Sequence, residues 1–203
     1  MNDSPKIQLS PFEQQLVTDP GWLLTKNAIL EKIKVLLMAV QDLQLPVLNT
    51  YKASLPAEIL KISPKITRGE NYLGLPWLVL DQPRYFEKEN IFAIRTMFWW
   101  GKFFSTTLQL SGSYKEQFET RISGEYEVLR KNDFHISHSD SPWDHHFEKD
   151  NYKSIDGFSK DEFAHHIRTH AFIKLAKKIS LEDWDRIGEK LEEDFRVLIR
   201  VLV

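Results

Sequence analysis

The sequence predicts a single α+β domain, in which a small antiparallel sheet is packed by N-terminal and C-terminal helices. Helix-start signals gather near both ends of the chain, and turn residues divide its middle into short segments rich in strand-forming residues. Of the 203 residues, 42% are hydrophobic, which is enough for a sizeable core. We expect one domain over residues 1–203, with helical segments at 10–45 and 159–203 around a sheet at about 62–111.

Capping boxes mark most of the helix starts. In a capping box, a Ser and a Glu three residues later each accept a hydrogen bond from the other's backbone N–H. Such boxes begin at Ser10, Ser113 and Ser159. Ser180 begins a weaker version that ends in Asp183, and Asp19-Pro20 supplies an acidic cap followed by proline. We therefore expect helices to begin near residues 11, 20, 114, 160 and 181.

The predicted helices carry apolar stripes, which are typical of faces turned toward a core. The stripe of the last helix consists of Trp184, Ile187, Leu191, Phe195, Leu198 and Leu202. We expect both aromatic residues of this stripe in the core. The chain ends in "FRVLIRVLV", where Val197, Val201 and Val203 exceed what one core is expected to cover. The C-terminal helix is therefore a candidate surface for a homo-oligomer.

The middle of the chain predicts at least three strands, in which residues 91–100 pair with residues 103–110, and residues 133–138 are a candidate further strand. The hairpin register is open. A two-residue turn at Gly101-Lys102 would put polar and apolar residues together on both faces of the hairpin. A loop of odd length would instead put the apolar residues on one face and most of the polar residues on the other. We favour the separated version. In both, Arg95 shares a face with Met97 and Trp99.

Composition excludes several classes of function. The net charge of −2, with basic and acidic residues interspersed, argues against a nucleic-acid partner. The absence of cysteine excludes disulfides, thiolate zinc sites and iron–sulfur clusters. The first residues, "MNDSPKIQLSPFEQQ", do not resemble a signal peptide, and no apolar run approaches the roughly 20 residues of a membrane helix. We expect a soluble, cytoplasmic protein without membrane contact.

All seven histidines lie between residues 135 and 170, and four of them fall in "HISHSDSPWDHHF", residues 135–147. One interpretation is a metal-dependent hydrolase or oxygenase, in which loop 135–146 binds zinc, iron or nickel through His138, Asp140 and His145. The spacing matches no established metal signature. The interpretation we favour is a polar loop that is anchored by Trp143 and Phe147, with its histidines facing outward.

The strand residues Arg95 and Trp99 are candidate ligand-binding residues. An arginine in the middle of a strand is costly unless it is paired. Its guanidinium suits a carboxylate or phosphate ligand. The alternative is a structural ion pair with an acidic residue such as Glu70 or Asp81.

His166 and His170 are the second pair of ligand-binding candidates. They lie four residues apart, on one face of the predicted helix, together with Lys174 and Lys177. Two ammonium groups disfavour a nearby metal cation, so this face suits a small anionic ligand or solvent.

These observations predict a small-ligand-binding or protein-interaction module without catalysis of its own and without a cofactor. The metal-dependent enzyme built on loop 135–146 is the alternative.

Overall fold

A seven-stranded sheet occupies the centre of the chain in our computed structural model, which describes residues 7–203. Residues 1–6, which begin the segment predicted not to be a signal peptide, lie outside the described residues. The strands are β1 (Lys65–Tyr72), β2 (Leu75–Phe86), β3 (Ile91–Trp99), β4 (Phe103–Ser111), β5 (His135–Ser137), β6 (Tyr152–Ser154) and β7 (Phe172–Ser180). Their order is β1-β2-β3-β4-β7-β5-β6, and neighbouring strands are antiparallel.

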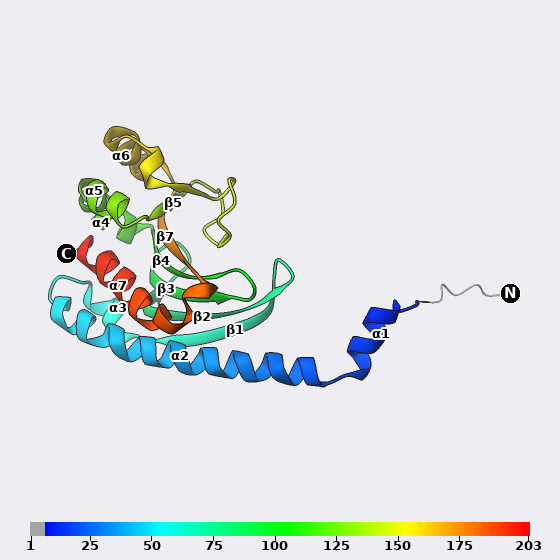
Figure 1. Ribbon diagram of the computed structural model, residues 1–203. Helices are drawn as coiled ribbons and strands as arrows, with labels where there is room; N and C mark the ends of the chain where they lie inside the picture. The colour runs from blue at the N-terminus through cyan, green and yellow to red at the C-terminus, as the bar shows by residue number, and fades with distance from the viewer. Residues whose placement is uncertain (1–6) are drawn as a thin grey trace.

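Most of the helices pack on one side of this sheet (Figure 1), which confirms the α+β fold class. They are α1 (Pro11–Thr18), α2 (Gly21–Tyr51), α3 (Ala57–Lys61), α4 (Ser113–Gly124), α5 (Tyr126–Lys131), α6 (Lys160–Thr169) and α7 (Ile187–Arg200), with short 3-10 helices at η1 (Ile155–Gly157) and η2 (Leu181–Arg186). The long helix α2 follows the sheet and packs against α7, whereas α1 projects away from both (Figure 1). Among residues 7–203, no helix has the length and hydropathy needed to cross a bilayer.

The core lies between the helices and one face of the sheet. Leu37 of α2 and Leu191 of α7 pack with Phe98 and Phe104 of the β3–β4 hairpin, and all four are almost fully buried. A second, larger cluster joins the other end of the same face to α4, α6 and the end of α7. Side chains alternate across a strand, so the opposite face of the sheet carries a different set of residues.

The β3–β4 register confirms the version that separates polar and apolar residues. Phe98 pairs with Phe104, and Trp99 pairs with Phe103, so three residues lie between the strands. Gly101, in the middle of this loop, has a φ of 67°, which is a conformation that glycine adopts readily. Burial of the apolar face therefore determines the register in preference to a two-residue turn.

Most helix starts agree with the prediction. Complete capping boxes form at Ser10 and Ser159. The helix expected near residue 114 begins at Ser113, but its N-cap is Gly112, and the Ser113 hydroxyl donates instead to Asn90 Oδ1 at 3.0 Å. Helix α2 continues to Tyr51, past the expected end at residue 45, because its last turns still bury apolar residues on the core.

The segment after α6 was predicted incorrectly as helix. Helix α6 ends at Thr169, and β7 then pairs with β4 and β5 near the middle of the sheet. The run "FIKLAKKIS" alternates in a strand-like way, with Ile173 and Leu175 toward the helices and Lys174 on the other face. A short apolar run of this kind fits both a strand and a buried helix.

The C-terminal segment gives one confirmed core residue and one correction. Phe195 is fully buried, as expected, but Trp184 is 43% exposed because residues 181–186 form a short 3-10 helix and the α-helix begins only at Ile187. Val201 is fully buried, and Val197 and Val203 pack against the core. The apolar C-terminus is thus covered within the chain.

Candidate functional site

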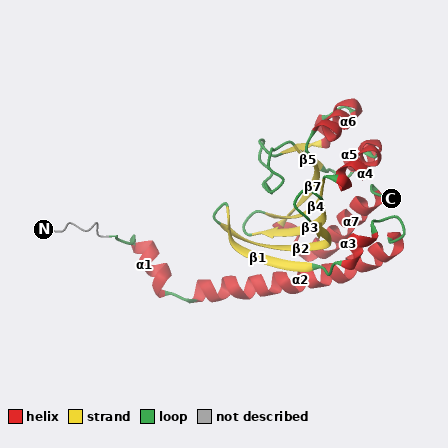
Figure 2. Cartoon of the chain, turned by 180° about the vertical axis from the view of Figure 1, so that it is seen from behind, coloured by secondary structure: helices red, strands yellow, loops and turns green. Residues whose placement is uncertain are grey.

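The face of the sheet turned away from the helices carries Arg95, Met97 and Trp99. Residues 138–151, which we call the cover loop, lie on this side of the sheet, opposite α2 (Figures 1 and 2). Phe147 of the cover loop meets Phe103 edge-on, with ring centroids 5.1 Å apart, and stacks on Tyr152 at 4.5 Å. This loop therefore covers part of a sheet face that no helix covers within the described chain.

The Arg95 guanidinium is held from two sides. Its Nε donates to Asp81 Oδ1 at 2.7 Å, and both side chains are largely buried. Its Cζ lies 5.7 Å from the ring centroids of both Phe86 and Trp143, which are distances typical of cation–π contacts. Its Nη1 is buried and has no hydrogen-bond partner among the described residues. The guanidinium is thus well positioned, but its donors are not all used.

A cavity of about 300 Å³ adjoins Arg95. Its wall consists of Asn71, Tyr72, Trp77, Val79, Arg95, Met97, Trp143 and His145. Three of these are large aromatic residues, two are aliphatic, and the charged group is Arg95. Mostly apolar walls with a few converging polar groups are typical of small-molecule sites, and this volume is at the lower end of their range.

Lys174 is a buried cation beneath the cover loop. Its side chain is fully buried, and its Nζ donates to the backbone oxygens of Pro142, at 2.9 Å, and of Asp144. Burial lowers the pKa of Lys174 to about 7, and the nearby Arg95 guanidinium contributes in the same direction. The amine therefore joins the centre of the sheet to the cover loop and can change its charge near neutral pH.

His145 stands between Lys174 and the cavity. Burial holds the pKa of its imidazole well below the ordinary value, and the neighbouring Lys174 and Arg95 lower it further, so the ring is neutral at pH 7. Its Nδ1 lies 3.4 Å from Lys174 Nζ. When Lys174 is protonated, its ammonium has no acceptor, so Nδ1 accepts from it and the proton of the neutral ring resides on Nε2. His145 thus adds a neutral imidazole to the cavity wall.

Tyr72 and Asn151 hold the cover loop in place. The Tyr72 hydroxyl accepts from the backbone N–H groups of His145, at 2.6 Å, and His146, at 3.2 Å. The Asn151 amide donates to the carbonyls of Asp144, at 3.0 Å, and His146, at 2.6 Å. These bonds give the loop a defined conformation beside the cavity.

The structure brings only some of the predicted ligand-binding residues together. Arg95 lines the cavity, and Trp99 lies behind it, with its ring 5.0 Å from that of Tyr72. His166 and His170 lie elsewhere: their Nε2 atoms approach the backbone oxygens of Ser137, at 2.9 Å, and of Ser139, at 3.0 Å. These two histidines connect α6 to the start of the cover loop.

The metal-site alternative is not supported by the geometry. His138 and Asp140 are exposed, and His138 Nε2 lies 2.9 Å from the Lys149 carbonyl. His145 faces the Lys174 amine, which disfavours a cation there. Between residues 7 and 203, no group of three or more His, Cys, Asp or Glu side chains is placed to hold a metal ion.

The cover loop also departs from its predicted arrangement. Phe147 packs as expected, but Trp143 is 49% exposed and stacks on Phe86 instead of entering the core. His145 turns inward instead of facing solvent, so it does not gain charge on mild acidification. The sequence pattern predicts a helix at Lys174 and therefore does not indicate Lys174 as a site residue. Its position among apolar residues in a strand-like alternation is the signal that identifies it.

No protein-family model matches the chain, and no match was found among curated proteins or solved structures.

Proposed function

We propose that the cavity beside Arg95 binds a small aromatic carboxylate, and that the protein is a small-ligand-binding module. The observation that supports this most directly is a buried guanidinium, incompletely hydrogen-bonded, in the wall of an otherwise aromatic cavity. Unsatisfied donors of a buried charged group are costly, and a ligand carboxylate would supply the missing acceptors.

The polar groups of the site favour an anion. Arg95 carries a permanent positive charge, Lys174 carries part of one at neutral pH, and the neutral His145 carries one ring N–H. Asp81 offsets one positive charge. The balance accommodates one carboxylate better than a doubly charged group such as a phosphate monoester.

The apolar groups favour a planar ligand. Tyr72, Trp77 and Trp143 offer ring faces and edges, and Val79 and Met97 are apolar residues of the adjacent strands. Trp143 is half exposed and lies beside the guanidinium, so its movement would open a path from solvent to Arg95. A flat ring with a carboxylate at one end satisfies both the aromatic wall and the guanidinium.

Calorimetric titration with 2-naphthoate tests the proposal, with neutral 2-naphthamide as the matched ligand. We expect the carboxylate to bind at least about tenfold more tightly than the amide. Arg95→Lys keeps the charge next to Asp81 but loses the planar guanidinium, and we expect it to remove most of that preference. The exposed Arg186→Lys is the control variant. Equal affinity for the two ligands, no binding of 2-naphthoate, or an unchanged preference in Arg95→Lys would refute the proposal.

A further inference from the structure

Helix α1 carries apolar side chains that the rest of the described chain does not cover. Phe12 is 67% exposed and Val17 is 72% exposed, and none of the α1 residues is buried. In both ribbon views α1 extends beyond the start of α2, away from the sheet (Figures 1 and 2). A helix of eight residues is marginal in water without packing, so an amphipathic segment of this kind requires a partner surface.

The corner between α1 and α2 holds α1 in this outward position. The Trp22 indole N–H donates to the Leu16 carbonyl at 3.0 Å, across the corner. Asp19 Oδ1 accepts from the Gly21 N–H at 2.8 Å, and Pro20 restricts the backbone between the helices. The connection is too short and too well bonded for α1 to fold back over its own chain without breaking these contacts.

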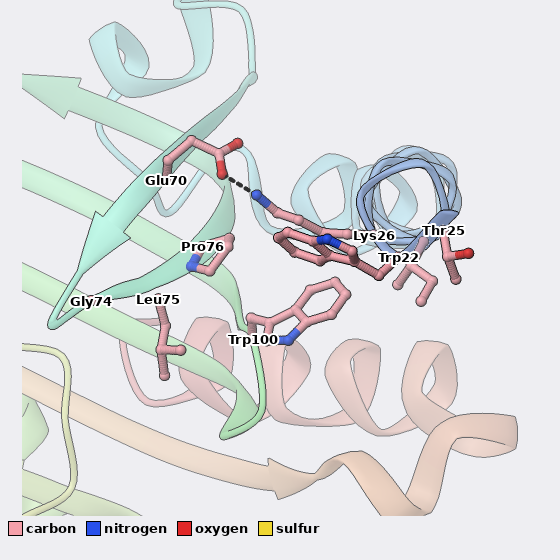
Figure 3. A pocket seen from close by; sticks show the side chains of 9 residues that line it. Trp22, Thr25, Lys26, Glu70, Gly74, Leu75, Pro76 and Trp100 are labelled. Atoms are coloured by element: carbon pink, nitrogen blue, oxygen red, sulfur yellow. Dashed lines mark hydrogen bonds and ion pairs between the residues drawn. The ribbon is translucent and has the colours of Figure 1, made fainter. Parts of the chain in front are cut away.

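A sizeable cavity lies next to this corner. It measures about 550 Å³ and opens between the first turns of α2, the β1–β2 turn and the β3–β4 loop. Its wall is mostly apolar and includes Trp22, Ile29, Leu75, Pro76 and Trp100 (Figure 3). Lys26 and Glu70 form an ion pair across one side, as the dashed line in Figure 3 marks.

We propose that this cavity receives α1 of a second copy of the chain, with Phe12 as the inserted side chain. Within the described residues the chain contains both a helix with uncovered apolar side chains and a mostly apolar cavity, and the fixed corner keeps them apart within one copy. A two-fold pair that exchanges its α1 helices covers both helices and both cavities and leaves neither surface open for a third copy. Leu23 and Leu24, which are 43% and 64% exposed, extend the apolar surface beside the corner.

This interface is distinct from the C-terminal helix that the sequence suggested for self-association, because the C-terminal apolar residues are already covered within the chain. It is also distinct from the cavity beside Arg95, with which it shares no lining residue. Its test is therefore independent of the ligand proposal.

Light scattering coupled to size-exclusion chromatography of the full chain provides the first test. We expect a dimer, and we expect Phe12→Asp to weaken it at least about a hundredfold. Thr25→Arg, an exposed change at the cavity wall, should act in the same way from the other side. Gln14→Asp adds the same charge on another face of α1 and should leave the dimer intact. A monomer at high concentration, or a dimer that survives both Phe12→Asp and Thr25→Arg, would overturn the proposal.

Disulfide trapping then identifies which chains meet, because the sequence contains no cysteine. Phe12→Cys and Thr25→Cys are made in separate chains, mixed and oxidised. We expect a covalent heterodimer from the mixture in excess of the homodimers that either chain forms alone. In the double variant, a disulfide that forms only within one chain would show that α1 covers its own cavity and would refute the exchange.

Discussion

Arg95 and Asp81 are direct cross-strand partners in β3 and β2, and Arg95 Nε lies 2.7 Å from Asp81 Oδ1. The side chains are 13% and 8% exposed, so the pair has little contact with solvent. Desolvation of two such charges offsets most of their attraction, and a buried pair of this kind contributes little net stability compared with apolar residues of similar size. Of the two residues, Arg95 lines the cavity that we propose as the ligand site.

Removal of only one residue of the Asp81–Arg95 pair should nevertheless lower the stability of the protein. We predict that Asp81→Ala lowers the free energy of unfolding by about 3–5 kcal/mol, because it leaves the Arg95 guanidinium buried without a counter-charge. Glu189→Ala removes an exposed ion pair with Arg186 and should cost no more than about 1 kcal/mol. Urea unfolding measures both. Similar losses in the two variants would show that Arg95 is reached by solvent.

The double variant Asp81→Leu/Arg95→Met separates stability from binding. We expect it to recover most of the stability lost in Asp81→Ala, because neither charge remains buried. It should still fail to distinguish 2-naphthoate from 2-naphthamide. A double variant that retains this distinction would assign anion recognition to another group.

Lys174 should make stability depend on pH. Its pKa is about 7 in the folded protein and 10.5 in the reference state, so between these values the unfolded chain binds more protons than the folded one. Stability contributed by this group therefore rises with pH across that window, by at most about 1.4 kcal/mol per pH unit. Below pH 7 both states are protonated, and the burial cost of the charge is present in full.

The measurement is urea unfolding from about pH 6 to about pH 10, with Lys174→Met as the comparison. The unfolding free energy of the wild type should rise with pH relative to that of Lys174→Met. Loss of the bonds to the cover loop lowers the stability of the variant at every pH, but it does not produce this difference in slope. Lys178→Met, an exposed residue on the same face of β7, should keep the wild-type slope. Parallel profiles for wild type and Lys174→Met would refute the lowered pKa.

Substitution of Phe195 by alanine should cost much more stability than substitution of Trp184, although both residues belong to the same apolar stripe of the sequence. Phe195 is fully buried, and Phe195→Ala should cost about 3–5 kcal/mol of unfolding free energy. Trp184 is 43% exposed and meets Phe104 edge-on at 6.0 Å, so Trp184→Ala should cost about 1 kcal/mol. Thermal unfolding monitored by circular dichroism compares them. A loss in Trp184→Ala as large as in Phe195→Ala would mean that η2 packs more tightly than the structure indicates.

The parts of the fold that the sequence predicts are those with local signals. Ser159 and Glu162 are three residues apart and together specify the start of α6. The β3–β4 register also follows from a pattern within twenty residues. Strand β7 was missed because its identity depends on partners in β4 and β5, which lie far away in the sequence.

The candidate site could be predicted only in part for the same reason. Arg95 attracts attention on its own, since a charge in an apolar strand needs a partner. Tyr72, His145 and Lys174 acquire their roles only when β1, the cover loop and β7 meet around the same sheet face. Composition and periodicity do not predict these contacts between distant segments. The histidine cluster, in contrast, is conspicuous in the sequence but is divided between α6 contacts and the cover loop.

Substitution of Gly69, which does not itself line the cavity, tests the role of the cavity residue Trp77. Gly69 of the edge strand β1 pairs with Trp77 of β2, and the Trp77 indole lies across the glycine. A Cβ at this position would stand 2.5 Å from the indole Cε2, which is closer than side chains pack, so Gly69→Ala must displace the ring. Because Trp77 lines the cavity beside Arg95, we predict that Gly69→Ala weakens 2-naphthoate binding by about tenfold and shifts the tryptophan fluorescence. Gly124→Ala meets no atom within 4 Å and should leave both properties unchanged. Gly69→Ala could instead shift the fluorescence and still bind 2-naphthoate as tightly as the wild type. The Trp77 ring would then move without contacting the ligand, and Tyr72 and Trp143 alone would form the aromatic part of the binding site.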